Sequence, residues 1–593
     1  MAGLIPQEQA GARLDQPDDY AVRARRLGLP FVPEVQLDAG SRADVDAIKR
    51  GEFAKSPGSD GAAFIAPSEA SMPDVLHWLA AHPGARRQLS VTTPTALREG
   101  LMQAGSRGFV EAAVQRLATR FPDLSARRIV TLAQVATGVV AVAGVAAALY
   151  VWPLPTLIAI NLIGAFFFFG VSVLRFIAAG FAARRDLAKE VEDANGDDEE
   201  GDLPTYTILV PLLNEAALVE ELVVALDGLD WPRDRLDIKL IVEADDAATL
   251  AAAHAVAGRP PYEVVVVPPA APRTKPKALA YALPFARGDY VTVYDAEDHP
   301  HPRQLREAHA VFARSEPDLA CLQAPLLVDN GSASLLARLF AIEYAALFDG
   351  LLPTLAALGM PLPLGGTSNH FRRDVLEEVG GWDPYNVTED ADMGVRLARF
   401  GYRTATITLP TFEEAPATLW PWIKQRTRWF KGWMQTWLVH TRRPWRLARE
   451  LGWRGLLGFN LFGTGLIVSA LVHPIYLVTV FAVVTDPLDL WGDGGAFASM
   501  VVGLNLFNLF AGYTAMAALG LRTLELRGRE RDGRALVLLP VYWLVMSFAS
   551  YRALFHLLIK PHRWEKTPHR GRRERTPRPK AIRAPRRSEG NSG

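Results

Sequence analysis

The sequence predicts a doubly wound α/β domain inserted between membrane-crossing helices, with a small α+β domain in front of it. Three observations support this prediction. Apolar stretches long enough to cross a bilayer lie on both sides of a polar region. That polar region alternates short β-branched runs with helical patterns, as α/β domains do. Residues 1–125 are mixed in polarity and show no secretory signal, so we expect a folded cytoplasmic region there.

The first membrane segments are expected at residues 129–151 and 155–176, joined by a tight turn at 152–154. Arginines precede this hairpin at 127–128 and follow it at 184–185. Because positive charge marks the cytoplasmic flank, both flanks are predicted to be cytoplasmic. Residues 185–450 contain no credible span, so they should form a cytoplasmic domain.

Three further apolar stretches follow, at 456–484, 497–521 and 535–558. The acidic loop at 486–493 fits the outside and the arginine-rich loop at 522–534 fits the inside. If the stretch at 535–558 crossed the membrane once, the basic tail would lie outside, which is contrary to the preference of positive charge for the cytoplasmic side. Pro540 and Arg552 favour an interfacial or re-entrant helix there; alternatively, the stretch broken at Pro474 is not a single span. We expect four to six spans, preferably an even number.

Composition limits the other possibilities. The 64 basic and 64 acidic residues cancel, which gives no indication of a nucleic-acid partner. The single cysteine, Cys321, cannot form an internal disulfide. Charged runs at 193–202 and beyond residue 560 are typical of solvated or disordered segments. The predicted regions are an N-terminal domain at 1–125, a hairpin at 126–185, an α/β domain at 200–415, interfacial helices at 416–450, C-terminal apolar helices at 451–560 and a basic tail at 561–593.

Within the α/β region, strands are predicted at 206–211, 237–242, 262–267 and 290–294, and helices at 215–229, 277–286 and 393–400. Ligands bind beyond the carboxyl ends of the strands in such sheets. Acidic residues directly follow two of these strands, at 243–246 and 295–298, so they should line one crevice.

The acids at this edge suit a divalent ion. Asp295, Glu297 and Asp298 offer the oxygen ligands that Mg²⁺ or Mn²⁺ prefers, and such an ion also binds phosphates. Alternatively, they are only a solvated acidic loop. Asp245 and Asp246 have a similar alternative, because an Asp that ends a strand often bonds turn amides.

Cationic groups follow in two places. Lys275 and Lys277 are possible phosphate donors, although loop lysines are ordinarily only solvated. The tryptophan-rich stretch around residues 425–429 (QRTRW) predicts an interfacial helix leading into the membrane. An arginine there can also grip a phosphate with two hydrogen bonds.

Thr388-Glu389-Asp390 precedes the last predicted helix. Thr388 or Asp390 could cap that helix. Capping is compatible with catalysis, because a carboxylate fixed at a helix start is held as rigidly as a general base should be.

In their order and spacing these motifs resemble the processive family-2 glycosyltransferases, which include the cellulose, chitin and hyaluronan synthases. The strings at 272–283, 294–300, 363–371, 386–394 and 425–437 are similar to a bacterial exopolysaccharide branch, the XagB-like synthases. The resemblance covers roughly residues 200–570 and implies a GT-A-like fold. It implies an inverting enzyme of the bacterial inner membrane that builds a β-linked glycan from a UDP-sugar, with the catalytic domain and both termini in the cytoplasm.

The resemblance also assigns roles to residues that should meet the donor. Asp245 and Asp246 match an acidic pair that contacts the base and ribose, and Lys275 matches a lysine near the diphosphate. Asp295 with Glu297 or Asp298 matches a metal-binding motif for Mg²⁺ or Mn²⁺. Here that motif reads DAED instead of DAD, which leaves the second ligand open.

Further roles concern the acceptor, the growing glycan. Asp390 matches the catalytic base, next to Glu389 in the acceptor-binding group. Gln425 and Arg428 match a diphosphate clamp, and Trp429 matches the residue that stacks the acceptor sugar. Residues 366–370, with Gly366 and Thr367 first, match a segment near the acceptor. All of these must converge on one pocket for this interpretation to hold.

Other features limit or extend the resemblance. No FxVTxK-like gating loop follows Trp429 and no PilZ-like domain follows the apolar helices, so cyclic-di-GMP control of the cellulose-synthase type is not supported. Residues 20–125 resemble the N-terminal domain of type II secretion ATPases. Polar residues in the apolar segments either line a path for the polymer or bond between helices; they are Asn460, His473, Asn505, Asn508 and Tyr513.

UDP-glucose is the preferred donor, followed by UDP-N-acetylglucosamine for a chitin-like polymer. Two alternatives remain open. One is the transfer of a single sugar to a lipid carrier, against which the QRTRW element argues. The other is a membrane scaffold or transporter with a degenerate transferase domain.

Overall fold

A computed structural model describes residues 17–37, 45–55, 62–196, 203–257, 260–485, 495–563 and 565. The chain divides into two compact units. Unit 1 comprises Met1–Arg120, Glu200–Ala296 and Phe371–Pro384, and unit 2 comprises Phe121–Glu199, Glu297–His370 and Tyr385–Gly593. The predicted acidic loop at 486–493 and the basic tail beyond residue 565 lie outside the described residues.

The N-terminal part of unit 1 combines helices with a small sheet. In the described residues, β2 pairs antiparallel with β1 and parallel with β3. The long helix α4 packs against β6 and α10 of the same unit. The elements are α1 (Pro17–Leu27), α2 (Val45–Arg50), β1 (Phe53–Lys55), β2 (Ala63–Ile65), α3 (Met72–Ala81), η1 (Pro83–Arg87), β3 (Leu89–Val91) and α4 (Pro94–Arg120).

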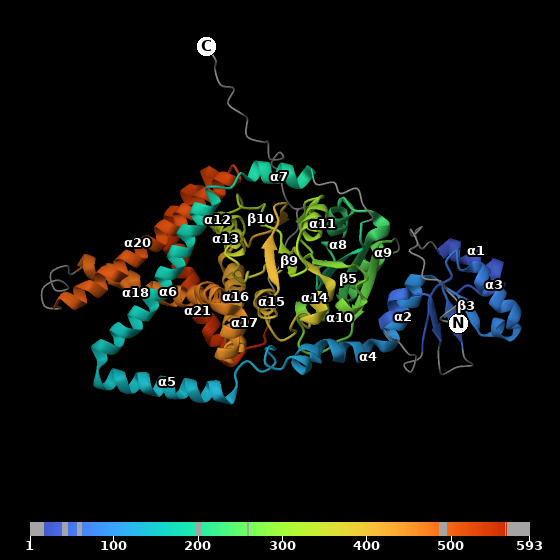
Figure 1. Cartoon of the computed structure of the whole chain (residues 1–593), viewed down its shortest axis with the longest axis horizontal. Coiled ribbons are helices and arrows are strands. Elements are labelled where there is room, and N and C mark those ends of the chain that lie inside the picture. The colour runs from blue at the N-terminus through green and yellow to red at the C-terminus, as the bar shows by residue number, and fades with distance from the viewer. Residues whose placement is uncertain are drawn as a thin grey trace, which may run out of the picture. The chain divides into compact units, whose positions relative to one another are not determined.

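The rest of unit 1 is a parallel sheet with helices packed on it (Figure 1). Its strands lie in the order β7-β4-β5-β6, and Tyr206 of β4 is opposite Leu236 of β5 and Tyr290 of β7. Every residue of β5 is buried, as expected for a strand covered on both faces. The elements are β4 (Tyr206–Leu212), α8 (Val219–Asp227), η2 (Arg233–Arg235), β5 (Leu236–Glu243), α9 (Ala247–Ala257), β6 (Tyr262–Val267), α10 (Lys275–Ala282), η3 (Leu283–Phe285), β7 (Tyr290–Val293) and α14 (Arg373–Glu378).

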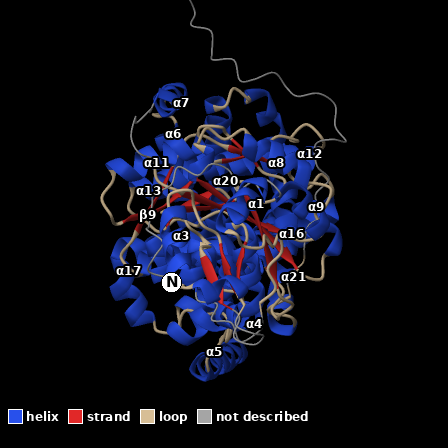
Figure 2. Cartoon of the chain, turned by 90° about the vertical axis from the view of Figure 1, so that its right-hand side faces the viewer, coloured by secondary structure: helices blue, strands red, loops and turns tan. Residues whose placement is uncertain are grey.

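The polar part of unit 2 contains short strands and the helices between them, coloured red and blue in Figure 2. β13 pairs parallel with β10 and antiparallel with β8, and β12 pairs parallel with β9. The chain passes from unit 2 to unit 1 within β11 (Asn369–Arg372). The other elements are β8 (His299–Pro300), α11 (Gln304–Arg314), β9 (Leu319–Gln323), β10 (Leu326–Val328), α12 (Leu335–Ala345), η4 (Ala346–Leu351), α13 (Leu352–Ala357), α15 (Glu389–Arg399), β12 (Arg403–Thr406) and β13 (Thr411–Glu413).

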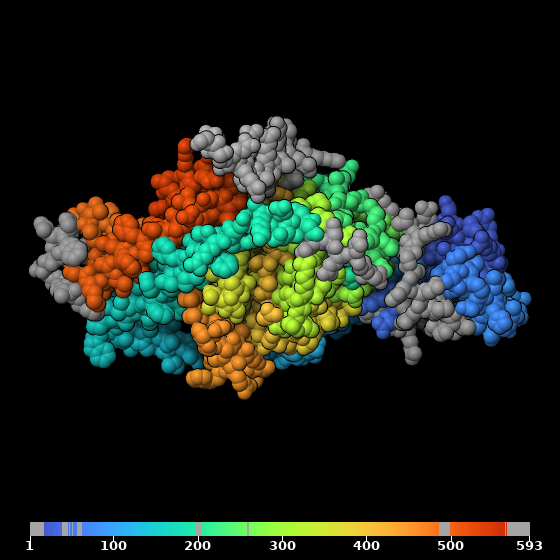
Figure 3. Space-filling view, turned by 45° about the horizontal axis from the view of Figure 1, so that its top comes forward, coloured from blue at the N-terminus to red at the C-terminus, as the bar shows by residue number. Residues whose placement is uncertain are grey.

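Unit 2 also contains the apolar helices. Among the described residues, five helical stretches are long and apolar enough to cross a membrane: Leu132–Val151, Pro153–Ala182, Pro444–Thr485, Ser499–Leu526 and Glu530–Ile559. Figure 3 shows the surface of α6, in teal, next to that of α20, in orange-red. The elements are α5 (Leu132–Val151), α6 (Pro153–Ala182), α7 (Leu187–Gly196), α16 (Leu419–His440), α17 (Pro444–Gly458), η5 (Phe459–Thr464), α18 (Gly465–Thr485), α20 (Gly495–Leu526), η6 (Glu530–Leu538) and α21 (Leu539–Ile559).

The apolar helices have surfaces suited to lipid. None of the side chains of α5 is buried, and Leu132 and Tyr150 at its ends are 86% and 90% exposed. Because a surface this apolar is unfavourable in water, these helices are consistent with a membrane protein. The predicted tight turn is confirmed, because α5 ends at Val151 and α6 begins at Pro153.

Polar residues within these helices mainly bond to neighbouring helices. His473 hydrogen-bonds to Tyr513 at 2.8 Å, and Asn505 accepts a hydrogen bond from Asn161 at 2.9 Å. The Asn508 amide donates to the Ala165 carbonyl at 3.2 Å. These contacts support helix-to-helix bonding for four of the residues that were suggested from the sequence as lining for a polymer path. Asn460 bonds within its own helix.

One predicted break was wrong. α18 continues through Pro474, and the irregular segment before it is the π-helical turn Phe459–Thr464. A proline is tolerated in an apolar helix when neighbouring groups satisfy the backbone that it leaves unpaired.

Candidate active site

Two acidic residues follow β5, and their surroundings differ. Asp245 is exposed, and its carboxylate accepts a hydrogen bond from Arg273 at 2.6 Å. Asp246 is buried and accepts bonds from the backbone N–H groups of Asn214 and Thr249, at 2.5 and 3.2 Å. The alternative that a strand-ending Asp bonds turn amides is therefore confirmed for Asp246. Asp245 is the acid of this pair with the greater access to solvent.

The two lysines of α10 pair with different acids. Lys275 forms an ion pair with Asp295 in the loop after β7. Lys277 is fully buried and pairs with Glu243, at the end of β5, at 2.7 Å. Burial raises the pKa of Glu243, and the hydrogen bond from Lys277 opposes that rise. Lys277 is thus part of a core ion pair, which makes the sequence-based suggestion that it meets phosphate wrong.

In unit 2, Asp298 contacts the predicted acceptor segment. Its Oδ2 accepts a hydrogen bond from the Thr367 hydroxyl. Gln323, the last residue of β9, fixes the same segment: it accepts from the Gly365 N–H at 2.7 Å and donates to the Thr367 carbonyl at 3.0 Å. The segment that contains Gly366 is therefore held at the end of β9, with Asp298 beside it.

Glu389 and Asp390 are the first two residues of α15. Glu389 is buried, and Asp390 is partly exposed with its Oδ1 accepting from the Ala391 N–H at 2.7 Å. The positive end of a helix dipole stabilises a carboxylate placed there. Thr388 occupies the N-cap position, but in the described residues its side chain makes no capping bond, so that part of the prediction was wrong. Its hydroxyl faces a different helix.

That helix is α16, which carries the residues of the QRTRW motif. A Cβ built on Gly432 would lie 2.1 Å from Thr388 Oγ1, so only glycine fits this contact. Gln435 accepts from the Val387 N–H at 3.2 Å, and Thr436 accepts from Asn386 at 3.0 Å. The start of α15 is therefore held against α16.

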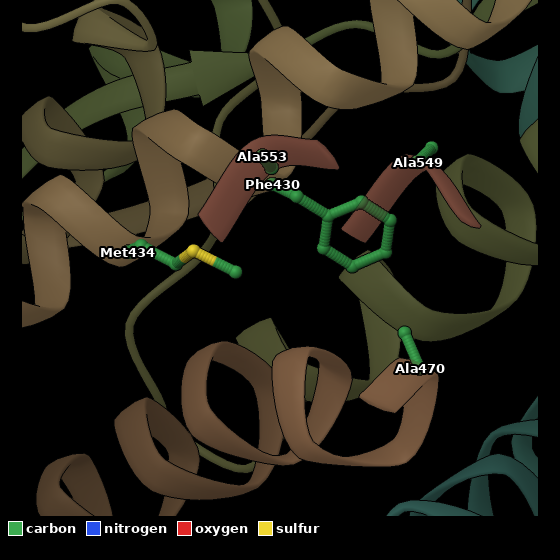
Figure 4. Close-up of a cluster of buried hydrophobic side chains, with 5 residues drawn as sticks. All are labelled: Phe430, Met434, Ala470, Ala549 and Ala553. Carbon is green, nitrogen blue, oxygen red and sulfur yellow. The ribbon is translucent and has the colours of Figure 1, made fainter. Parts of the chain in front are cut away.

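The helical period shows which residues share that face of α16. Each residue turns the helix by about 100°, so positions separated by three, four or seven residues face the same way. Gln425 and Arg428 precede Gly432 by seven and four residues. They therefore lie on the face that Gly432 turns toward Thr388. The opposite face carries Phe430 and Met434, which pack against Ala470 of α18 and Ala549 and Ala553 of α21 (Figure 4).

α15 also contacts the segment before Gly366. A Cβ built on Gly394 would lie 1.9 Å from the Leu362 carbonyl oxygen. Within unit 2, α15 is thus packed both against α16 and against Leu362, four residues before Gly366. Two glycine contacts and the hydrogen bonds from residues 386–387 bring these segments together, and the convergence of the site residues on one pocket stays a prediction.

Trp429 has an aromatic and cationic setting that the sequence did not predict. Tyr344 of α12 stacks on it with ring centroids 6.2 Å apart and planes at 25°, and the Arg426 guanidinium lies 4.4 Å from its ring centroid. Arg426 is itself bound by Glu343 through two parallel bonds of 2.7 Å, and the Tyr542 hydroxyl donates to Glu343 at 2.6 Å. Trp429 is therefore packed against Tyr344 of α12 and against the Arg426 guanidinium.

A buried charge network anchors the far end of α16. His440 bonds to Asp392 at 2.9 Å through Nε2, and its Nδ1 lies 2.9 Å from Arg399. Arg396 also pairs with Asp392. Burial alone would raise the pKa of Asp392, but the charge of Arg396 and the bond to His440 lower it overall. Burial lowers the pKa of His440, so this histidine is neutral at pH 7.

The donor groups suit a divalent ion that also binds phosphate. Asp295, Glu297 and Asp298 supply carboxylates within four residues, yet in the described ranges no three acidic, His or Cys side chains gather closely enough to enclose a metal. Mg²⁺ is commonly held by one or two carboxylates together with substrate phosphates. These residues fit that mode and do not fit an all-protein cage.

The chain resembles known transferases. The model of glycosyl transferase family group 2 matches residues 290–491. The probable glycosyltransferase YdaM of Bacillus subtilis is 26% identical over 321 residues, which is 52% of this chain and 73% of that protein. The beta-monoglucosyldiacylglycerol synthase of Synechocystis is 28% identical over 266 residues, 44% of this chain and 53% of that protein.

The cellulose synthase catalytic subunit of Pseudomonas fluorescens is 26% identical over 327 residues, covering 52% of this chain and 39% of that protein. The chain thus spans about half of the Synechocystis enzyme and less of the cellulose synthase subunit. Among solved structures, the Pyrobaculum calidifontis mannosyltransferase PcManGT, in complex with GDP-Man and Mn²⁺, has a TM-score of 0.45 and 19% identity, and the match covers 68% of this chain and 99% of that one. The chain is a glycosyltransferase with an α/β fold, and its residues 290–491 match glycosyl transferase family group 2.

Proposed function

We propose that the chain is an inverting synthase of the bacterial inner membrane that polymerises a β-linked exopolysaccharide from a UDP-sugar. UDP-glucose is the first candidate donor and UDP-N-acetylglucosamine the second. The likeness to cellulose synthase catalytic subunits, which are named as UDP-forming, supports a UDP-sugar. The motifs shared with XagB-like synthases support an exopolysaccharide product.

On the donor side, Asp245 contacts the nucleoside, since it is exposed and paired with an exposed arginine. Asp246 stabilises the adjacent turn, because its carboxylate accepts a hydrogen bond from the Asn214 backbone N–H. Lys275 meets the diphosphate and exchanges its bond to Asp295 for one to phosphate. When bound, Mg²⁺ or Mn²⁺ held by Asp295 and Glu297 offsets negative charge on the departing diphosphate. Glu297 is preferred to Asp298, which is buried and bonded to Thr367.

Asp390 is the general base. It takes the proton of the acceptor hydroxyl while that oxygen bonds to the anomeric carbon and the bond from this carbon to the diphosphate breaks. Attack from the side opposite the leaving group inverts the configuration. Placement at the start of α15 puts the carboxylate at the positive end of the helix dipole, which stabilises its negative charge.

The acceptor and the leaving diphosphate are held by motif residues of unit 2. Gln425 and Arg428 bind the diphosphate as it departs, the glutamine through its amide N–H and the arginine through its guanidinium. Trp429 stacks the acceptor sugar, with Glu389, Gly366 and Thr367 near the same sugar. The single observation that carries this proposal is the Gly432–Thr388 contact, because it brings the face of α16 with Gln425 and Arg428 to the helix that begins with Asp390.

Purified protein in detergent should be incubated with radiolabelled UDP-glucose, UDP-N-acetylglucosamine and UDP-galactose, with Mg²⁺, Mn²⁺ or EDTA. The proposal expects one donor to give a polymer only with the metal present, and linkage-specific glycanases then identify the bond. Transfer that is unaffected by EDTA would contradict the metal assignment, and failure of every UDP-sugar would contradict the donor class.

A second candidate is the transfer of one sugar to a lipid. The likeness to a glucosyldiacylglycerol synthase over 44% of the chain favours it, as do the paired polar groups within the apolar helices. The same assay separates the two candidates: labelled material that extracts into organic solvent as a single glycolipid supports lipid transfer, and high-molecular-mass polymer supports synthesis of a glycan.

We further propose that α21 lies along the membrane interface, so that four helices cross the bilayer and both termini are cytoplasmic. Both ends of α21 lie near elements of the catalytic region. Before it, Asp532 pairs with Arg338 of α12 at 3.4 Å; after it, the Pro561 carbonyl accepts from Gln435 of α16 at 2.9 Å. A helix of 21 residues is about 31 Å long, so a crossing would place its ends on opposite sides.

A further inference from the structure

The chain continues past α21 and returns to the QRTRW helix. Residues 560–563, here called the C-terminal segment, are fixed mainly through their backbone carbonyls. Lys431 Nζ donates to the Arg563 carbonyl at 2.5 Å and to the Lys560 carbonyl at 3.4 Å. Gln435 Nε2 donates to the Pro561 carbonyl at 2.9 Å. Both donors are on α16, three and seven residues after Arg428, and both are buried.

Gln435 has a second contact, on the other side of its amide group. Its Oε1 accepts a hydrogen bond from the Val387 N–H at 3.2 Å, immediately before Thr388. The side chain is fully buried, so neither bond is easily replaced by water. One amide thus joins the C-terminal segment to the loop that leads into α15.

His562 makes a parallel connection. Its Nδ1 lies 3.2 Å from the Tyr385 carbonyl oxygen, and its ring packs edge-on against the Tyr385 ring with centroids 5.7 Å apart. Residues 385–387 are therefore contacted twice by groups that depend on the C-terminal segment. The position of this loop sets where α15 begins and hence where Asp390 lies.

The segment also lies in a group of positive charges. Arg552 of α21 pairs with Glu565 at 3.0 Å. Lys431 is close enough to Arg428, Arg552 and Arg563 for their charges to act on it, and burial together with these charges lowers its pKa to about 8. Lys431 is held on the C-terminal segment by its bonds to two carbonyls. Arg428, three residues earlier on α16, is one of the proposed diphosphate-binding residues.

We propose that Gln435 is a positioning residue for the transfer reaction, which places Asp390 by tying the loop at 385–387 to the C-terminal segment. The C-terminal segment thereby contributes to the placement of the catalytic base. This inference rests on the proposed role of Asp390 as base. It assigns no contact with substrate to Gln435, Lys431 or His562.

The two halves of the Gln435 amide can be tested separately in the full-length protein. Gln435→Glu keeps an oxygen for the Val387 N–H but removes the donor to Pro561, whereas Gln435→Met removes both bonds at nearly constant size. Lys431→Met removes the neighbouring anchor and Lys431→Arg restores a donor. Gln115→Met is the matched control, because Gln115 is exposed on α4 and bonds only within its own helix.

The measurements are kcat and KM for the labelled UDP-sugar, together with thermal unfolding in detergent. Misplacement of a base slows the chemical step without weakening donor binding. Gln435→Met should therefore lower kcat by at least about tenfold, with the KM for the donor within about twofold of wild type. Gln435→Glu should show a smaller loss of kcat, Lys431→Met a loss that Lys431→Arg recovers, and Gln115→Met no change.

Several outcomes would overturn the proposal. A wild-type kcat in Gln435→Glu and Lys431→Met would do so, and so would a rise in KM with kcat unchanged, since that would place Gln435 on the donor side. If Gln435→Met does not fold, Gln435→Glu and His562→Ala decide the question by the same measurements. Asp390→Asn, assayed in parallel, separates the role of Asp390 as base from the role of Gln435 as positioning residue. Turnover by Asp390→Asn would contradict the role of Asp390. If Asp390→Asn is inactive but the Gln435 variants have normal activity, only the role of Gln435 is contradicted.

Discussion

Gly432 of α16 packs directly against Thr388, whose hydroxyl would lie 2.1 Å from a Cβ on the glycine. The two residues are 44 positions apart, and each belongs to a motif that the sequence singled out. Their contact explains why Thr388 does not cap α15. It also orients α16 so that Gln425 and Arg428 share the face that packs against Thr388, two residues before Asp390.

The first prediction follows from that contact. Gly432→Ala should force α16 away from Thr388, lower stability by about 1–3 kcal/mol as overpacked sites do, and lower kcat by at least about tenfold. Gly108→Ala is the control, because nothing lies within 4 Å of a Cβ at that helical position. Thermal unfolding and sugar transfer should be measured for both variants. Normal activity in Gly432→Ala would mean that the packing of α16 on Thr388 does not position the active groups.

The second prediction concerns Arg426. Arg426→Lys keeps the charge but loses the two-pronged bond to Glu343, so Trp429 should lose its support. Because this leaves a partly buried acid poorly paired beside a buried cation, we expect a destabilisation of at most about 3–5 kcal/mol and shorter products. Product length can be measured by size-exclusion chromatography of labelled glycan.

The control for Arg426 is Arg403→Lys. Arg403 makes the same two-pronged contact with Asp318, but both side chains are about half exposed. Exposed pairs contribute roughly 0–1 kcal/mol, so this variant should behave like wild type. Equal losses in the two variants would argue against a special role for Arg426.

The third prediction is a loss of stability in acid that depends on His440. The folded protein holds His440 with a pKa below its usual 6.5, so only the unfolded chain takes up the proton as pH falls through that value. Stability should therefore fall below about pH 6.5, by at most about 1.4 kcal/mol per pH unit for this group. Asp392 has a lowered pKa, so its contribution is present above its usual 3.8 and is lost only at lower pH.

His440→Gln tests the origin of this effect. Glutamine can donate to Asp392 and accept from Arg399 but does not titrate between pH 5 and 7. The variant should therefore lose stability less steeply than wild type over that range, as measured by thermal unfolding at a series of pH values. An unchanged slope would assign the pH dependence to other groups.

The sequence predicted local structure well where the pattern itself determines it. The strands at 206–211 and 262–267 were found within one residue, because a buried β-branched run has few other solutions. The helix after β4 begins at Val219 and not at residue 215, because turns occupy the residues between. Strand-ending acids were placed correctly for the same local reason.

Contacts between residues far apart in the chain could not be predicted from the sequence. Nothing near Lys277 shows that it is buried against Glu243, because the partner lies 34 residues earlier on another element. Arg426 was seen only as part of a motif, since its partners Glu343 and Tyr542 are about 80 and 116 residues away. Two features of the sequence could have indicated this packing. They are Gly432, four residues after Arg428, and Arg426, a charged residue on an aromatic helix face.

The fourth prediction concerns the membrane placement of α21. In a Cys321→Ser background, single cysteines introduced by Arg531→Cys and Lys560→Cys should react with an impermeant maleimide only in inverted vesicles. Trp152→Cys, in the turn between α5 and α6, should react only from the outside of intact cells. Labelling of Lys560→Cys from outside would mean that α21 crosses the membrane once.

The most direct test of the account replaces one oxygen at the start of α15. Asp390→Asn keeps the shape of the side chain but cannot accept the proton of the acceptor hydroxyl. Sugar transfer by the purified variant should fall by about 10²-fold or more, while UDP binding, measured by calorimetry, stays near the wild-type value. Turnover at the wild-type rate with intact UDP binding would contradict Asp390 as the base and, with it, the proposed mechanism.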